Sequence, residues 1–425
     1  MYYKVLLIIL FMEYMRPDKS LPLIGAMKVN VLLPLFLFVA SFLSDAPDKL
    51  SNSQILKTSP AKWLFFFLFL TVLSVFSAEM TTWAYARFEQ VLGYIFLFWI
   101  IAKEANTLNR LKGMFAILAF VHIGLLILNP DVITHPETRS YIKNVSFLGD
   151  GNDFALSVLI TFSLILFLIQ DARHKWMRYL FIFSLVALIL TLIGSQSRGA
   201  TLSFACVLIY QWWRSRRKGV GIAVIGTMVA VVVLYAPPQY FERVESIAAY
   251  ETDGSAQGRI WAWKAGARMA VEYPLTGVGA GHFPWAHAGH FKPKEFEGRN
   301  YPMKTAHSIY FLALGELGFP GLLFILAVIF GNLWKYDRLI KKLGEYPDDA
   351  DAIRVRRLLV AINSALLGYG AAGAFLSALY YPHIFILMGI FVASGHIINR
   401  EFPEISLRLE LQKEGRIRGN QELQV

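Results

Sequence analysis

The sequence predicts an all-α polytopic membrane protein of about 12 spans, with one long loop that contains short helices. Two observations support this fold class. Of the 425 residues, 56% are hydrophobic and only 17% are charged, whereas soluble domains carry about 25% charged residues. The apolar residues also come in blocks of about 16 to 22, which cross a hydrocarbon core of roughly 30 Å as helices. Helices are expected because each span must satisfy its own backbone hydrogen bonds in lipid.

Twelve segments fit this description, of which the first and the eighth are short. They are roughly 3–15, 27–43, 63–78, 86–102, 112–129, 153–170, 177–194, 200–213, 219–236, 306–333, 357–378 and 382–398. The chain then divides into spans 1–9 within 1–235, a long loop at 236–306 with interfacial helices, spans 10–12 within 307–398, and a tail at 399–425.

The basic residues set the orientation. With a cytoplasmic N-terminus, 26 Lys and Arg fall on inside segments and seven on the short outside loops. Cytoplasmic loops carry the excess of positive charge in membrane proteins. Both termini are therefore expected inside and the long loop outside. The net charge of +11 reflects this topology. It does not indicate nucleic-acid binding, because the basic residues are scattered over many loops.

The long loop is expected to contain one substantial helix. Its stretch Gly258 to Tyr273 is helical in pattern and ends at Pro274, which cannot continue a helix. The indoles of Trp261 and Trp263 suit a helix that lies at the membrane interface. No soluble domain and no repeat of 20–50 residues is visible in the sequence.

Polar residues that could carry chemistry collect at the expected outer rim. Arg198 occupies a short outside turn, and Arg259 opens the interfacial helix. Either arginine is suited to bind a phosphate group in a bidentate way. Contact with ordinary phospholipid headgroups is the structural alternative. His307 lies where the long loop re-enters the membrane, and histidine is the natural general base near neutral pH. A hydrogen-bonded interfacial histidine is the structural alternative.

Further polar residues lie close to the same rim. Asp150, Asn152 and Asp153 precede or begin span six, where they either cap the helix or contact a sugar hydroxyl. Arg87 and Arg16 are candidates for an outer-face phosphate site.

Two other features favour structural roles. The spacing of His282, His287 and His290 matches no strong metal-ligand pattern, so no metal is expected. Glu316 lies within span ten, nine residues after His307, and so on the opposite side of the helix. A structural hydrogen bond is at least as good an interpretation of Glu316 as a functional one.

Together these motifs resemble the O-antigen ligase and polymerase family of bacterial membrane glycosyltransferases. The matching pieces are EYMRP at 13–17, GDGND at 149–153, SQSRGA at 195–200, GRIWAW at 258–263, PLTGVGAGHF at 274–283 and HSIYFLALGELGFPG at 307–321. The order of these pieces, the topology and one large outside loop before a histidine-led span carry the resemblance, which covers about residues 10 to 398.

The resemblance implies a location and a reaction. The protein would lie in the bacterial inner membrane with its active site facing the periplasm. It would move a glycan from undecaprenyl diphosphate to an acceptor hydroxyl, with the lipid A–core oligosaccharide as the first candidate. Arg198, Arg259 and His307 match the family's functional residues. Arg87, Arg16, Asn152, Asp153 and Trp261 are expected substrate contacts, and no metal or other cofactor is implied.

Elementary chemistry agrees with this implication. Diphosphate is a leaving group whose charge grows as the glycosidic bond breaks. Fixed arginines can stabilise that charge outside the cell. His307 would accept the proton of the attacking hydroxyl, and attack opposite the diphosphate would invert the anomeric carbon.

Several alternatives remain open from the sequence. An O-antigen polymerase would use the same donor and add it to another lipid-linked glycan, and a protein O-oligosaccharyltransferase would use a protein hydroxyl. A flippase or other transporter usually carries ionisable residues at mid-membrane depth and internal repeats, whereas most spans here lack such residues and no internal repeat is found. A non-catalytic scaffold explains the topology alone.

Overall fold

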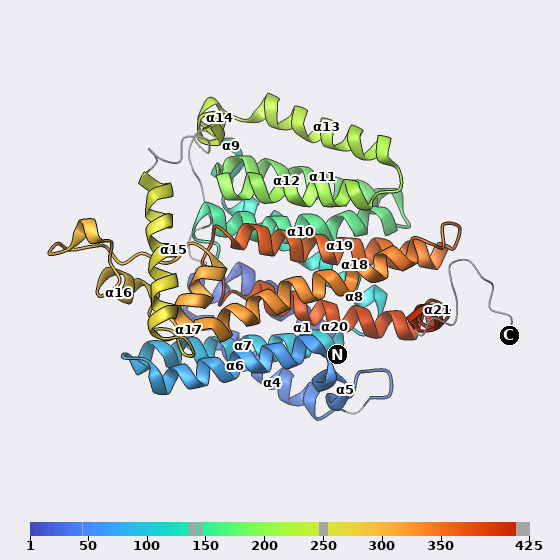
Figure 1. The fold of residues 1–425 in the computed structure, drawn as a ribbon. Coiled ribbons are helices and arrows are strands. Elements are labelled where there is room, and N and C mark those ends of the chain that lie inside the picture. The colour runs from blue at the N-terminus through green and yellow to red at the C-terminus, as the bar shows by residue number, and fades with distance from the viewer. Residues whose placement is uncertain (45, 136–141, 143–146, 246–253, 414–425) are drawn as a thin grey trace.

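The computed structural model describes residues 1–44, 46–135, 142, 147–245 and 254–413. All regular secondary structure within these residues is helical, and most of the long helices run side by side in one bundle (Figure 1). The chain is a polytopic helical membrane protein, so the predicted fold class is confirmed.

Every predicted span coincides with a helix. These helices are α1 (Tyr2–Met15), α4 (Val29–Phe42), α6 (Ser59–Ser77), α7 (Thr81–Glu104), α8 (Leu108–Leu128), α10 (Gly151–Asp171), α11 (Lys175–Gly194), α12 (Arg198–Arg214), α13 (Lys218–Tyr235), α17 (Ile309–Leu326) with its continuation α18 (Asn332–Leu343), α19 (Ala350–Gly373) and α20 (Pro382–Glu401). Eight of the described helices are long and apolar enough to cross a membrane by themselves. The other four, α1, α4, α12 and α19, are shorter or less apolar.

Helices from both ends of the chain share one core. α10 packs closely on α19, α19 on α12, and α20 on α7. The C-terminal helices therefore lie between two groups of N-terminal helices. α13 is the exception: it lies at the edge of the bundle, and Met228 is its single buried residue (Figure 1).

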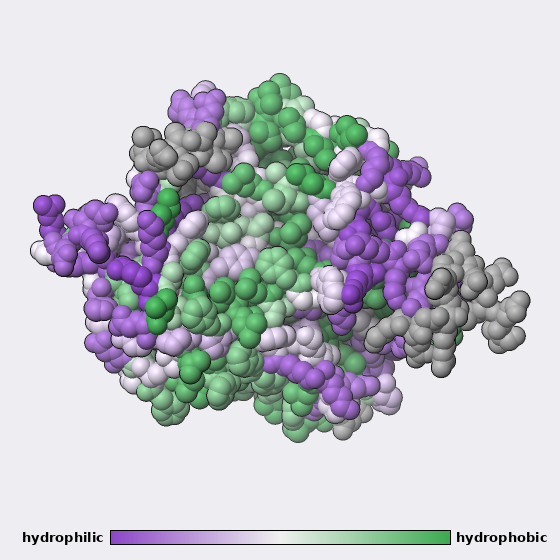
Figure 2. Space-filling view, in the orientation of Figure 1, coloured by the Kyte–Doolittle hydropathy of each residue, from purple (hydrophilic) through white to green (hydrophobic). Residues whose placement is uncertain are grey.

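The connections lie at two ends of the bundle. α21 (Pro403–Lys413) and the α18–α19 connection lie at one end, while α9 (Asp131–Thr134), α14 (Pro238–Glu245), α15 (Gly254–Glu272) and α16 (Phe283–Ala288) lie at the other (Figure 1). Figure 2 shows an apolar surface across the middle of this face and hydrophilic surface at both ends. The remaining short helices are α2 (Pro17–Ser20), α3 (Pro22–Ala26), α5 (Asn52–Lys57), η1 (Lys294–Phe296) and η2 (Ala327–Gly331), which joins α17 to α18.

The helix predicted in the long loop is α15. It begins at Gly254, four residues earlier than expected, and ends at Glu272, just before Tyr273 and Pro274. Figure 1 shows α15 running across the end of the bundle, at a steep angle to the long helices.

A break in α17 anchors the segment that follows α15. Gly318 has φ +65°, and a Cβ there would lie 2.4 Å from the carbonyl oxygen of Pro274. Its neighbour Phe319 donates its N–H to that oxygen over 2.9 Å. The Glu316 carboxylate accepts the N–H groups of Gly281 and Phe283 over 2.8 Å and 3.1 Å. Glu316 therefore makes the structural hydrogen bonds that its position suggested.

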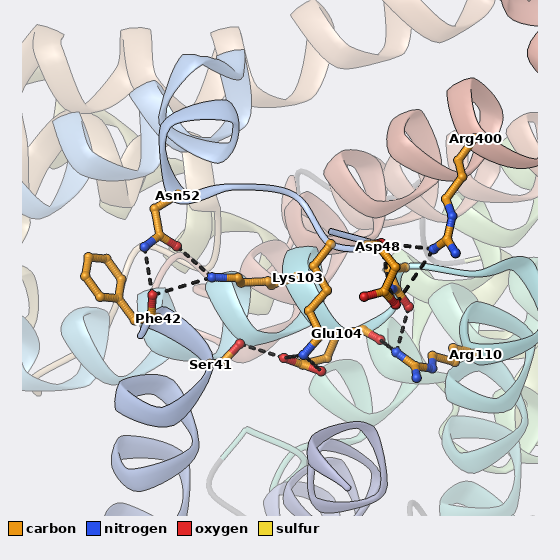
Figure 3. A network of polar contacts seen from close by, with 10 residues as sticks. Ser41, Phe42, Asp48, Asn52, Lys103, Glu104, Arg110 and Arg400 are labelled. Atoms are coloured by element: carbon orange, nitrogen blue, oxygen red, sulfur yellow. Dashed lines mark hydrogen bonds and ion pairs between the residues drawn. The ribbon is translucent and has the colours of Figure 1, made fainter. Parts of the chain in front are cut away.

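A buried polar network ties α4, α7 and the α4–α5 connection together at the end opposite α15 (Figure 3). Glu104 is 1% exposed. Its carboxylate accepts hydrogen bonds from the Ser41 hydroxyl over 2.7 Å and from the Lys49 ammonium over 2.7 Å and 2.8 Å. The buried Lys103 ammonium donates to Asn52 Oδ1 over 3.0 Å.

Replacing Glu104 by alanine should destabilise the fold by about 3 kcal/mol, because it leaves the largely buried Lys49 ammonium without its carboxylate. The measurement is chemical unfolding of the purified protein in detergent micelles. Glu404→Ala is the control, since that side chain on α21 is 84% exposed. Equal unfolding midpoints for the two variants would contradict the structural role given to Glu104.

Candidate functional site

A polar cavity of about 440 Å³ lies at the end of the bundle that carries α15. Four separate stretches of the chain line it. They contribute Asp150 and Asn152; Gln196, Ser197, Arg198 and Gly199; Gly254, Ala256, Gly258 and Arg259; and Lys304 and His307. Segments more than 150 residues apart in sequence therefore meet at one site.

The turn before α12 sets the position of Arg198. Ser197 caps the helix, with its hydroxyl oxygen accepting the N–H of Ala200 over 3.0 Å. Gln196 is buried and holds a left-handed backbone with φ +47°. Gly199 packs on the Phe375 side chain, where an added Cβ would come within 3.0 Å. Arg198 is thus the first residue of a helix whose start is fixed by a cap and by close packing.

The backbone around His307 is held on two sides. The N–H of His307 donates to the Ser377 hydroxyl over 2.9 Å, and the Thr305 hydroxyl also donates to Ser377 over 2.8 Å. The indole N–H of Trp263, on α15, donates to the Ala306 carbonyl over 3.1 Å. His307 itself has φ +48°, a conformation uncommon outside glycine that often marks functional positions.

The first turns of α15 form one wall of the cavity. Arg259 lies in the second turn, and Gly258 precedes it. A Cβ at Gly258 would lie 3.8 Å from the Lys304 ammonium, which shows how closely that lysine approaches the helix. The ring of Trp263 stacks on Phe311 of α17 with centroids 5.3 Å apart. α15 is therefore fixed against the helix that His307 precedes.

The start of α10 also lines the cavity. Asp150 is its N-cap residue, and Oδ1 of Asp150 accepts the N–H of Asn152 over 2.7 Å. The capping interpretation of Asp150 is confirmed. Both residues also line the cavity, so capping and contact with a bound molecule are compatible.

The electrostatics of the cavity favour an anion. Its described lining includes the cations Arg198, Arg259 and Lys304, and a single carboxylate, Asp150. The N-termini of α10, α12 and α15 also meet here, and each helix has at least 17 residues. Helix N-termini carry partial positive charge and point N–H groups at a ligand. A phosphate or diphosphate group suits this combination.

The imidazole of His307 is suited to accept a proton. Its pKa lies below the ordinary value of 6.5, first because burial disfavours the charged form and then because Arg259 and Lys304 repel it. The carboxylate of Asp150 acts in the other direction. The ring is therefore mostly neutral at neutral pH, which is the form that a general base requires.

Four other residues predicted to contact substrate lie outside the described lining of the cavity. Arg16 forms an ion pair with Asp18 over 3.1 Å. Arg87 donates to Gln90 over 2.8 Å and lies over the ring of Tyr380. The other two residues also have neighbours elsewhere: Trp261 packs on Phe296, and Asp153 lies close to Tyr381.

The three loop histidines have separate partners. His282 Nε2 accepts the N–H of Met80 over 3.0 Å, and His287 Nδ1 contacts the Lys304 carbonyl over 3.2 Å. His290 lies 3.4 Å from Glu272. Among the described residues, no group of three or more His, Cys, Asp or Glu side chains could hold a metal ion.

Sequence reasoning did not single out Lys304 or Gln196. Lys304 lies three residues before His307, and a lysine in a loop is too common to stand out. Gln196 lies inside the arginine turn, but its left-handed backbone is visible only in the structure.

The comparison with known families matches three of the four stretches that line this cavity, all except Asp150 and Asn152. A family model described as O-Antigen ligase matches residues 183–326, about a third of the chain. The matched segment contains Arg198, Arg259, Lys304 and His307. No curated protein is similar enough to count as a match. The match runs through the arginine turn, the long loop and the histidine-led helix, so this part of the chain is similar to the O-antigen ligase family.

Proposed function

We propose that this protein transfers a glycan en bloc from undecaprenyl diphosphate to an acceptor hydroxyl on the periplasmic face of the bacterial inner membrane. The observation that carries the proposal is the meeting of Arg198, Arg259 and His307 in one cavity. Two cationic residues and a mostly neutral imidazole, drawn from three separate segments, are the groups that such a transfer needs. The similarity to the O-antigen ligase family supports the same class of reaction.

The donor diphosphate would bind against the two arginines. Guanidinium groups can bind phosphate oxygens in a bidentate way, and their charge does not depend on pH in the working range. As the bond between the anomeric carbon and the phosphate oxygen breaks, the leaving diphosphate gains negative charge. Arg198 and Arg259, with the three helix N-termini, would stabilise that charge more in the transition state than in the ground state. Fixed cations in this role allow transfer without a metal ion.

His307 would act on the acceptor. Its neutral imidazole accepts the hydroxyl proton while the oxygen forms a bond to the anomeric carbon. The electron pair of the broken bond leaves with undecaprenyl diphosphate. Attack from the side opposite the diphosphate inverts the anomeric centre. Asn152 lies on the same cavity and is suited to contact a sugar hydroxyl.

The position of the cavity within the bundle supports a periplasmic active site. The cavity lies at the end of the bundle that carries the long loop, and the basic connections lie at the other end. By the distribution of Lys and Arg, the long-loop end faces the periplasm and both termini face the cytoplasm. The lipid-linked donor would then reach the cavity from the outer leaflet.

Reconstitution tests the proposal and its closest alternative. The purified protein in liposomes should convert lipid-linked glycan plus lipid A–core into a single product, enlarged by one donor glycan, also in the presence of EDTA. It should form no product from the donor alone. A ladder of products from the donor alone would instead establish a polymerase. Transfer to neither lipid A–core nor another hydroxyl acceptor would overturn the proposal.

A further inference from the structure

Asp150 is an unexpected charge in this cavity. It is the one carboxylate among the described lining residues, and three cations share the site with it. A carboxylate beside a diphosphate weakens binding of that group, because like charges repel. The negative charge of Asp150 therefore disfavours binding of the donor diphosphate, so we infer that it has a different function in the site.

Capping of α10 does not require the charge. The cap is one hydrogen bond from the N–H of Asn152 to Oδ1 of Asp150. Asparagine places a carbonyl oxygen at the same point and caps helices about as well as aspartate. The negative charge adds at most a modest interaction with the helix dipole.

His307 shares the cavity with this charge. Asp150 lines the cavity at the start of α10 and His307 lines it just before α17, and the carboxylate favours the protonated form of the imidazole. The other charged groups around the imidazole are Arg259 on α15, Lys304 on the same segment and Arg198 on α12. All three are cations and oppose a protonated imidazole. Among the described lining residues, Asp150 has the negative charge that favours the protonated imidazole.

We propose that Asp150 is a positioning residue for His307, whose carboxylate stabilises the imidazolium formed when His307 takes the acceptor proton. This inference rests on the proposed function of His307 as the base. No new bond forms at Asp150, and the proton stays on the imidazole until the product leaves. The carboxylate lowers the cost of creating a fourth positive side chain in the cavity beside Arg198, Arg259 and Lys304.

The test is the Asp150→Asn variant, which keeps the cap and removes the charge. Asp131→Asn is the control, since Asp131 on α9 is a 77% exposed carboxylate at the same end of the bundle and outside the described lining. Loss of the carboxylate should lower kcat roughly tenfold. It should leave the donor KM unchanged or reduced, because one repulsive charge is gone. The acid limb of the pH–activity profile should move to lower pH in the Asp150 variant alone.

A direct titration separates this inference from the proposed function. ¹³C-labelled histidine in the wild type, with His307→Gln to assign the signal, reports the pKa of His307 by NMR without any transfer. The pKa should fall in Asp150→Asn and in the capping variant Asp150→Ser, and stay unchanged in Asp131→Asn. An unchanged His307 pKa in both Asp150 variants overturns the inference. Full transfer by the His307 variant would instead overturn the proposed base, whatever the titration shows.

Discussion

Replacing His307 by alanine should lower glycan transfer by about 10²–10⁴-fold, the usual contribution of a positioned general base. The imidazole lines the cavity, and its backbone is fixed by Ser377. A methyl group cannot accept the hydroxyl proton. The measurement is the initial rate of transfer in liposomes at equal protein levels. Donor binding should remain close to that of the wild type, since the arginines are intact.

The pH dependence gives a second signature of the same residue. The base works only in its neutral form, and the pKa of His307 lies below 6.5 because of burial and the nearby cations. Wild-type transfer should therefore be close to its maximum at neutral pH and fall as the pH drops through the lowered pKa. The residual activity of the alanine variant should lack this limb.

His290→Ala is the matched control for a lost histidine. That side chain is 73% exposed and lies beside Glu272, outside the described lining of the cavity. Its removal should leave both the rate and the pH profile unchanged. Equal rates for the His307 and His290 variants would remove His307 from the mechanism.

Replacing Arg198 by alanine should reduce kcat by about 10²–10³-fold, because the variant loses a cation aimed at charge that grows in the transition state. The donor KM should also rise, since the diphosphate is already charged in the ground state. Arg198→Lys should recover only part of the rate, because lysine keeps the charge and loses the bidentate geometry. Steady-state kinetics with the lipid-linked donor measures both parameters.

The Arg259→Ala variant should behave in the same way, and the double variant should lose less than the product of the single losses, because both arginines act on one diphosphate. Arg299→Ala is the control, as Arg299 is an exposed arginine of the same long loop. Near-normal transfer by Arg198→Ala and Arg259→Ala together would show that the diphosphate binds elsewhere.

Much of the architecture followed from the sequence because it depends on local properties. The length and apolarity of each block determined the twelve helices, since a span in lipid must form its own hydrogen bonds. Pro274 marked the end of α15, and a cap at the start of α10 was one of the two interpretations of Asp150. The start of α15 was missed by one turn, because helix beginnings depend on weaker signals than a proline stop.

The residues that line the site were harder to predict from the sequence than the helices were. Arg198, Arg259, His307 and Asn152 stood out by residue type and by their place at helix starts, and all four line the cavity. Arg87, Arg16, Asp153 and Trp261 looked equally suitable in sequence but lie outside the described lining. Which polar residues of a rim face inward depends on helix rotation and packing, and a single sequence holds little information on either.

The sequence by itself determined that this protein is a helical membrane protein with a polar rim at its long-loop end. Only the tertiary structure brought Asp150 and Lys304 into the same cavity as His307. That meeting depends on contacts between distant segments: Gly199 on Phe375, Trp263 on Ala306, and Ser377 beside His307. The physical reason is that spans form from local hydrogen bonds and hydrophobicity, whereas a site between helix ends forms from the packing of whole helices.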